Sequence, residues 1–170
     1  MRDGFQLVAR IPYPLIQPKH LVVASEVATM DFLRLQGIPV PKVYGYSAVA
    51  DNAAGSEYIF MEFVGGRNLG YIWDDMPGKD RRTVITKLVE LESRLFALRF
   101  PASGSLYYTK DLQPEIDKVI FPTMSDGYFC IGPDTRRALW YGKRLDLQVD
   151  RGPCKYEPCL PCHTRAISID

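Results

Sequence analysis

Residues 5–11 read FQLVARI, and residues 57–66 read EYIFMEFVGG. Both segments are rich in β-branched and aromatic residues, which favour strands. Each is closed by residues that stop a strand, Pro12 and Pro14 after the first and Gly65-Gly66 at the end of the second. Each segment is therefore predicted to be a strand, and the residues between them decide the fold class.

A helix and one more strand are predicted between these segments. From Leu21 to Gln36, apolar residues recur on one helical face at intervals of four, three and three: Val23, Val27, Met30 and Leu33. Gly37 suits the C′ position that ends such a helix, and the prolines of residues 38–41 prevent its continuation. Residues 42–46 read KVYGY and form a short strand. The order strand, helix, strand, strand predicts an α+β fold with an antiparallel sheet and one helix.

A second helix is the clearest prediction in the rest of the chain. Its apolar residues alternate at intervals of four and three: Val84, Leu88, Leu91, Leu95 and Leu98. Asp80 is its candidate N-cap, and charged residues fill the other face. We expect it to pack as a core helix of a second, helical lobe. Further on, residues 105–108 and 129–133 are predicted to be extended, and residues 136–147 have a weaker helical pattern.

The composition argues against several classes of partner. The chain has 170 residues, of which 21 are basic and 20 acidic, and 46% are hydrophobic. No basic stripe indicates nucleic-acid binding, and no apolar run approaches the roughly 20 residues of a membrane segment. Four cysteines are too few for a disulfide framework, so the main body is expected to hold reduced thiols.

The first strand carries Arg10, and the first helix carries Glu26. A strand-borne cation that pairs with the α and β phosphates, held by a helix-borne carboxylate, is one way to bind a nucleoside triphosphate. Arginine suits this position because its guanidinium forms bidentate contacts with phosphate and with carboxylate. On the alternative interpretation, Arg10 is a surface-facing strand residue and Glu26 a solvated helix residue.

The run Met61-Glu62-Phe63-Val64 is a candidate hinge. Because Gly65-Gly66 follows at once, exposed backbone N–H and C=O groups of this run would be free to meet an adenine edge, with Met61 lining the pocket behind it. Alone, this run indicates only a buried strand. In order with Arg10 and Glu26, it favours a nucleotide-binding unit.

Four segments in this order resemble fungal members of the aminoglycoside phosphotransferase-like, protein-kinase-like family: residues 9–12 (ARIP), 24–30 (ASEVATM), 38–44 (IPVPKVY) and 55–62 (GSEYIFME). The similarity continues through FPASGSLYY at 100–108 and CIGP at 130–133 to about residue 153. It covers roughly nine tenths of the chain.

The resemblance implies a two-lobed kinase-like fold that binds ATP and magnesium and transfers the γ-phosphate to a small-molecule hydroxyl. Arg10 would take the phosphate-contacting strand position, with Glu26 as its partner. Glu62 and Val64 would supply the hinge backbone. Residues 1–66 would be a partial small lobe and hinge, and residues 67–153 the start of an incomplete, mainly helical lobe.

The catalytic loop of the family is not found in the sequence. That loop needs a His-x-Asp with an asparagine five residues beyond the aspartate, which supply a base and a magnesium ligand. The two asparagines, Asn52 and Asn68, come too early, and neither His20 nor His163 has the required aspartate. We therefore assign no catalytic and no metal-binding residue. We also expect the phosphate-covering loop to precede Asp3, so that the fragment is incomplete at both ends and its own binding of ATP is not implied by the resemblance.

Residues 154–170 do not resemble the family, as expected of a disordered tail or of a frameshifted, mis-spliced or incomplete gene model. Cys154, Cys159, Cys162 and His163 can be written as four zinc ligands, and residues 159–163 match the C-x-x-C-H pattern of haem attachment. We favour a chance match, because the spacing lacks a second knuckle and few residues follow to build a haem pocket; a zinc site is the alternative, and haem attachment is the least favoured.

The sequence thus predicts a fragment of an ATP-dependent small-molecule phosphotransferase that is inactive as written. A non-catalytic, pseudokinase-like module that binds nucleotide or a partner is the alternative. A fragment without a ligand, which associates through exposed apolar surface, is the third interpretation. Cytoplasmic and mitochondrial locations are both compatible with the sequence.

Overall fold

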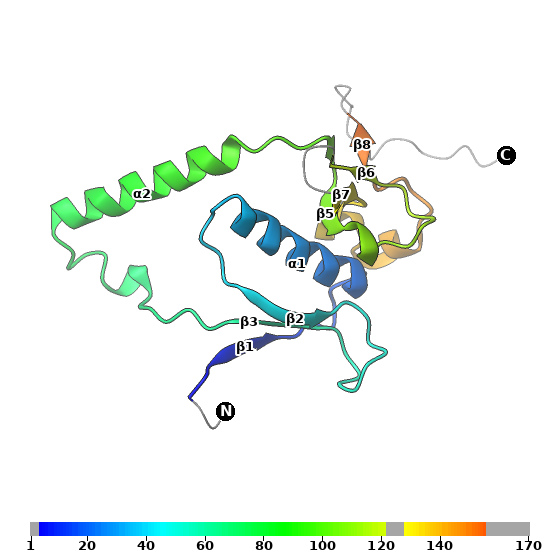
Figure 1. Cartoon of the computed structure of the whole chain (residues 1–170), viewed down its shortest axis with the longest axis horizontal. Coiled ribbons are helices and arrows are strands. Elements are labelled where there is room, and N and C mark those ends of the chain that lie inside the picture. The colour runs from blue at the N-terminus through cyan, green and yellow to red at the C-terminus, as the bar shows by residue number, and fades with distance from the viewer. Residues whose placement is uncertain (1–3, 122–127, 156–170) are drawn as a thin grey trace.

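In the computed structural model, residues 4–121 and 128–155 are described, and in these ranges two α-helices and two three-stranded antiparallel sheets form most of the fold (Figure 1). A two-stranded pairing of β4 (Ala102–Ser103) with β8 (Cys154–Lys155) adds to them. The fold is therefore α+β, as predicted.

The first sheet consists of β1 (Leu7–Arg10), β2 (Val43–Ser47) and β3 (Tyr58–Glu62), in the order β1-β3-β2. All three predicted strands are confirmed. Arg10 lies opposite Ile59, and Val8 lies opposite Met61. Directly opposed residues share a face of the sheet. Because Ile59 is buried with residues of the first helix, this face is the one that carries Arg10 toward that helix.

Helix α1 (Lys19–Leu35) ends as the sequence predicts. Gly37 has a φ of +70°, its N–H donates to the carbonyl of Arg34 (2.8 Å), and the N–H of Ile38 donates to that of Leu33 (2.9 Å). These two bonds form the Schellman motif that satisfies the last carbonyls of a helix. This turn directs the chain that follows α1 back toward β2.

The second sheet consists of β5 (Ser105–Tyr108), β6 (Val119–Ile120) and β7 (Phe129–Gly132), in the order β5-β7-β6. Extended segments at 105–108 and near 129–133 are therefore confirmed. Short 3-10 helices lie at Leu69–Tyr71, Thr109–Asp111, Arg137–Leu139 and Gly142–Asp146. The helix expected over residues 136–147 is wrong in kind, because two 3-10 helices replace it and Gly142, the first residue of the second one, has a φ of +61°.

Helix α1 lies between the two sheets and supplies the centre of the core (Figure 1). On one side it meets Ile59 of β3, and on the other it meets Leu106 of β5 and Ile131 of β7. The Phe32 ring lies 5.5 Å from that of Phe121 and 5.6 Å from those of Phe100 and Phe129. Segments before and after the predicted hinge therefore share one core.

Helix α2 (Gly78–Phe96) is confirmed as a helix, but its expected packing is not found. None of its residues is buried against the described part of the chain, and it projects away from the sheets (Figure 1). Leu88 is 53% exposed and Phe96 83% exposed, because no described element covers its apolar face. Pro77 is the N-cap, and Asp80 lies in the first turn instead. The described part of residues 67–153 is thus not mainly helical.

One side chain of α2 does reach the rest of the fold. Arg94 donates from Nη2 to the carbonyls of Gln36 (3.2 Å) and Gly37 (2.5 Å), just past the end of α1. A guanidinium at this position satisfies free carbonyls and complements the negative end of the helix dipole.

Replacing Phe32 by alanine is expected to lower the free energy of unfolding by about 3–5 kcal/mol, because a buried aromatic ring is lost from the core. Phe96→Ala is the matched control, and its largely exposed ring should contribute less than about 0.5 kcal/mol. Urea unfolding followed by circular dichroism measures both values. Equal losses in the two variants would contradict a core centred on α1.

Candidate functional site

The structure brings Arg10 and Glu26 together. Arg10 is the last residue of β1, and Glu26 lies in the middle of α1. Their atoms Nη1 and Oε1 are 2.7 Å apart, and the side chains are 53% and 23% exposed, respectively. One side of the guanidinium is thus held by the carboxylate, while about half of the side chain remains accessible. This is the strand-to-helix ion pair that the sequence predicts.

Burial governs the electrostatics of Glu26. Loss of solvent raises the pKa of its carboxyl group, and the Arg10 charge lowers it by less. A raised pKa in the folded state means that protonated Glu26 favours folding, and that this contribution is lost as the pH rises through the folded-state pKa. At neutral pH, the ionised carboxylate therefore costs stability even with Arg10 beside it.

A cavity of about 270 Å³ lies beside this ion pair. Its wall includes Arg10 and Glu26, the loop at residues 11–16, Val22 and Val23 of α1, and Ile59 of β3. The guanidinium is the cationic group in this wall, and apolar side chains surround it. Such a wall is suited to an anionic group bound beside Arg10 and an apolar group deeper in the cavity.

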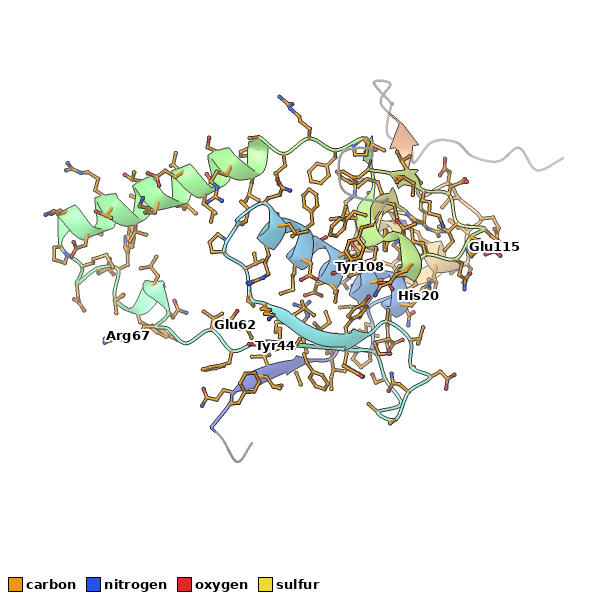
Figure 2. All side chains as sticks on the ribbon, in the orientation of Figure 1. His20, Tyr44, Glu62, Arg67, Tyr108 and Glu115 are labelled. Atoms are coloured by element: carbon orange, nitrogen blue, oxygen red, sulfur yellow. The ribbon has the colours of Figure 1, made fainter. Side chains whose placement is uncertain are left out.

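The predicted hinge residues lie elsewhere on the sheet. Met61 packs against the main core cluster, and Val64 is 65% exposed beyond the end of β3. Glu62 secures the sheet, because its Oε2 accepts from the Lys42 N–H (3.0 Å) and its own N–H donates to the Lys42 carbonyl (2.8 Å). Figure 2 shows Glu62 where the chain leaves the sheet toward Arg67. None of Met61, Glu62 and Val64 lines the Arg10 cavity.

The residues present fit one part of a bound nucleoside triphosphate. Arg10 is positioned and accessible, as a phosphate contact requires, whereas the amide of Glu62 is already used within the sheet. Among the described residues, no group of three or more His, Cys, Asp and Glu side chains could hold a metal ion. Three of the four candidate zinc ligands, Cys159, Cys162 and His163, lie outside the described residues.

Both asparagines have structural partners. Nδ2 of Asn52 donates to the Val49 and Ser56 carbonyls (2.7 and 2.8 Å), and Oδ1 of Asn68 accepts from the Gly70 N–H (2.9 Å). The former closes the loop between β2 and β3, and the latter caps a 3-10 helix. Their amides are therefore used in turns.

A polar cluster that no local sequence pattern predicts joins the two sheets. Tyr46 of β2 donates to Asp111 (2.7 Å), and Tyr108 of β5 donates to Asp31 of α1. Burial, followed by the carboxylate partners, raises the pKa of both tyrosines, so they remain protonated donors. Lys110 lies over both rings, with Nζ at 5.7 Å from the Tyr46 ring and 5.3 Å from the Tyr108 ring. The paired residues are far apart in sequence, so no local pattern indicates this contact.

Cys130 is a buried free thiol, and burial raises its pKa, so it is expected to be unreactive at neutral pH. Neither of the described helices is long and apolar enough to cross a bilayer.

The chain is homologous to fungal proteins over most of its length. It is 43% identical over 158 residues to a subtelomeric hrmA-associated cluster protein of Aspergillus fumigatus, covering 92% of this chain and 30% of that protein. Identity to the altered inheritance of mitochondria protein 9, mitochondrial, is 35% over 156 residues in Zygosaccharomyces rouxii, covering 81% of this chain and 25% of that protein. In Saccharomyces cerevisiae it is 33% over 165 residues, with coverages of 86% and 26%.

The chain therefore spans between a quarter and a third of the length of the curated relatives it matches. No protein-family profile and no solved structure matches it. The comparisons thus identify fungal relatives of the chain. The names of these relatives do not specify a reaction.

Glu26→Gln is expected to leave the melting temperature at pH 7 unchanged or to raise it, because burial disfavours the charge that the substitution removes. Any advantage over the wild type should disappear as the pH falls and Glu26 becomes protonated. Glu90→Gln, at an exposed position on α2, is the control and should change stability by less than about 0.5 kcal/mol. Thermal unfolding between pH 4 and 8 measures these differences. A clear loss of stability in Glu26→Gln at pH 7 would mean that the ion pair is a net structural contact.

Proposed function

We propose that the chain is the nucleotide-holding part of a kinase-like, ATP-dependent small-molecule phosphotransferase, related to the aminoglycoside phosphotransferases. The observation that carries the proposal is the contact of 2.7 Å between Arg10 on β1 and Glu26 on α1. In kinases, a cation on a strand of the small lobe meets a glutamate on the following helix in the same way and contacts the phosphates.

The energetics of Glu26 support this assignment. Its ionised carboxylate is disfavoured by burial, yet it holds an arginine that keeps half of its side chain exposed at a cavity. A structural ion pair of this kind gives little stability. A carboxylate with a raised pKa and a charged partner beside a cavity is more typical of a functional site.

In this proposal, ATP would carry its phosphates to Arg10, and Mg²⁺ would come with the nucleotide. Glu26 orients the guanidinium, so that its other N–H groups are directed to an anion. The N–H of Glu62 is used within the sheet formed by β1, β2 and β3, so the backbone after it, at Val64, would meet the adenine outside the Arg10 cavity. Magnesium would also screen the phosphate charges.

The 170 residues alone are proposed to bind nucleotide without transferring phosphate. Transfer requires a base for the acceptor hydroxyl and an asparagine that binds magnesium, and the two asparagines present are used in turns. The acceptor is a small molecule in the related phosphotransferases, and its identity would depend on the part of the relatives that this chain does not span.

A non-catalytic nucleotide- or partner-binding module is the second candidate. The observation that favours it is the uncovered apolar face of α2, where Leu88 and Phe96 are largely exposed. Such a face is typical of a surface that another polypeptide covers. The two candidates differ in whether phosphate is transferred by the longer proteins, and the second also includes a module that binds a partner without nucleotide.

Mg-ATP is expected to raise the melting temperature of the chain, because a ligand bound only by the folded state stabilises that state. At ten times its dissociation constant, the stabilisation is about 1.4 kcal/mol, which corresponds to roughly 3–6 °C. Arg10→Gln should abolish most of this shift. Arg82→Gln, which removes an exposed arginine from α2, should leave it intact.

The same samples test transfer. No Mg-ATP turnover above buffer is expected with a panel of small hydroxyl acceptors. Phosphate transfer by the purified chain would disprove its proposed inactivity. An absent shift, or a shift that Arg10→Gln retains, would disprove the nucleotide site at Arg10.

A further inference from the structure

A larger cavity, of about 570 Å³, lies on a different face of α1 from the Arg10 site. Its helical wall is formed by Ser25, Thr29, Phe32 and Leu33, whereas the Arg10 cavity uses Val22, Val23 and Glu26. The two cavities share no lining residue. The opposite wall comes from residues 100–106, Ile131 and the turn at Asp134. A volume between about 300 and 1,000 Å³ is usual for sites that bind small molecules.

The helical wall presents a hydroxyl group to the cavity. Ser25 is 7% exposed, and its side chain makes no hydrogen bond to any residue in the described ranges. Thr29 lies one helical turn further along the same wall. No buried side-chain nitrogen or oxygen in the described ranges lacks a hydrogen-bond partner, so the unpaired Ser25 oxygen is one that solvent still reaches from the cavity. The Ser25 hydroxyl is therefore available to pair with a polar group of a ligand inside the cavity.

Apolar side chains line most of the remaining wall. The rings of Phe32 and Phe100 lie 5.6 Å apart in a tilted arrangement, and Leu106 and Ile131 face them from the second sheet. These residues belong to the main core cluster or pack against it, so their side chains are held in place by the surrounding core. Such a wall selects a flat or compact apolar body.

An arginine is held at the edge of the cavity. Asp134 accepts from Nε of Arg136 (2.6 Å) and from its backbone N–H (2.8 Å). The Arg136 side chain is 68% exposed, and its two Nη groups make no hydrogen bond within residues 4–121 and 128–155. A carboxylate anchored on one edge of a guanidinium leaves the other edge to bind an acceptor. The edge of the cavity thus favours an anionic group.

We propose that this cavity binds an aromatic carboxylic acid that carries a hydroxyl group. The aromatic body lies against Phe32, Phe100 and Ile131, the hydroxyl pairs with Ser25, and the carboxylate pairs with the Nη groups of Arg136. The site is independent of nucleotide binding at Arg10. Because both sites lie on α1, a ligand in either cavity contacts the same helix.

Fluorescence titration with 6-hydroxy-2-naphthoate tests the proposal on the full chain. The probe has the three required groups, and saturable binding is expected. 2-Naphthoate, which lacks the hydroxyl, should bind roughly five- to tenfold more weakly, the ratio that corresponds to one hydrogen bond. Saturating Mg-ATP should leave the affinity for the probe unchanged, because the cavities share no residue.

Two variants identify the contacts. Ser25→Ala should weaken binding of the hydroxylated probe roughly fivefold and leave that of 2-naphthoate unaltered. Arg136→Gln should weaken both probes roughly tenfold or more. Arg137→Gln is the matched control, because Arg137 lies over the Tyr141 ring (4.8 Å) and does not line the cavity. It should have no effect.

Leu88→Gln removes an exposed apolar side chain of α2 and controls for probe bound to that face. It should leave binding unchanged, and circular dichroism should show that every variant is folded. The proposal is overturned if no saturable binding is seen up to 1 mM probe, or if the wild type, Ser25→Ala and Arg136→Gln bind the probe with equal affinity. Displacement of the probe by Mg-ATP, or loss of binding in Leu88→Gln, would also overturn it.

Discussion

The need to bury α1 on more than one side governs the rest of the structure. Its buried residues are distributed around much of the helix: Leu21, Val23, Ala24, Ser25, Val27, Ala28 and Phe32. One sheet covers only one stripe of a helix. The first sheet covers the side that meets Ile59, and the second covers the side that meets Leu106 and Ile131. Residues 7–62 and the described residues of 105–121 and 128–132 consequently contribute to one core, although α2 separates them in sequence.

The two cavities follow from this arrangement. A helix held on both sides presents neighbouring residues to different surroundings, since successive side chains are about 100° apart. Glu26 meets the arginine of β1, whereas Ser25 lines the cavity beside the second sheet. The Tyr46–Asp111 and Tyr108–Asp31 hydrogen bonds join the sheets and the helix at a third position. The position of Arg10, the proposed nucleotide contact, therefore depends on residues outside β1 and α1, the two elements that carry Arg10 and Glu26.

Local sequence patterns predict most of the helices and strands of this fold. They do not predict the contacts between residues that are far apart in sequence. Proline, glycine and periodicity identified β1, α1, β2, β3 and α2, and the order of elements paired Arg10 with Glu26. One apolar stripe of α1 was recognised at Val23 and Val27, but a second, formed by Leu21, Ala24, Ala28 and Phe32, was missed. That stripe indicates the second sheet. The periodicity of α2 predicted its helical form correctly, yet periodicity does not specify a partner, and its apolar face is uncovered among the described residues. Ser25 and Arg136 form one cavity through tertiary packing alone.

Native-state hydrogen exchange at individual amides tests most directly whether α1 makes one cooperative core from both sheets. Amides in α1, β3 and β5 should open with the same free energy, close to that of global unfolding, and amides in α2 should exchange at a much lower free energy. The contradictory result would be two separate levels, with α1 and β3 opening together while β5 and β7 open independently.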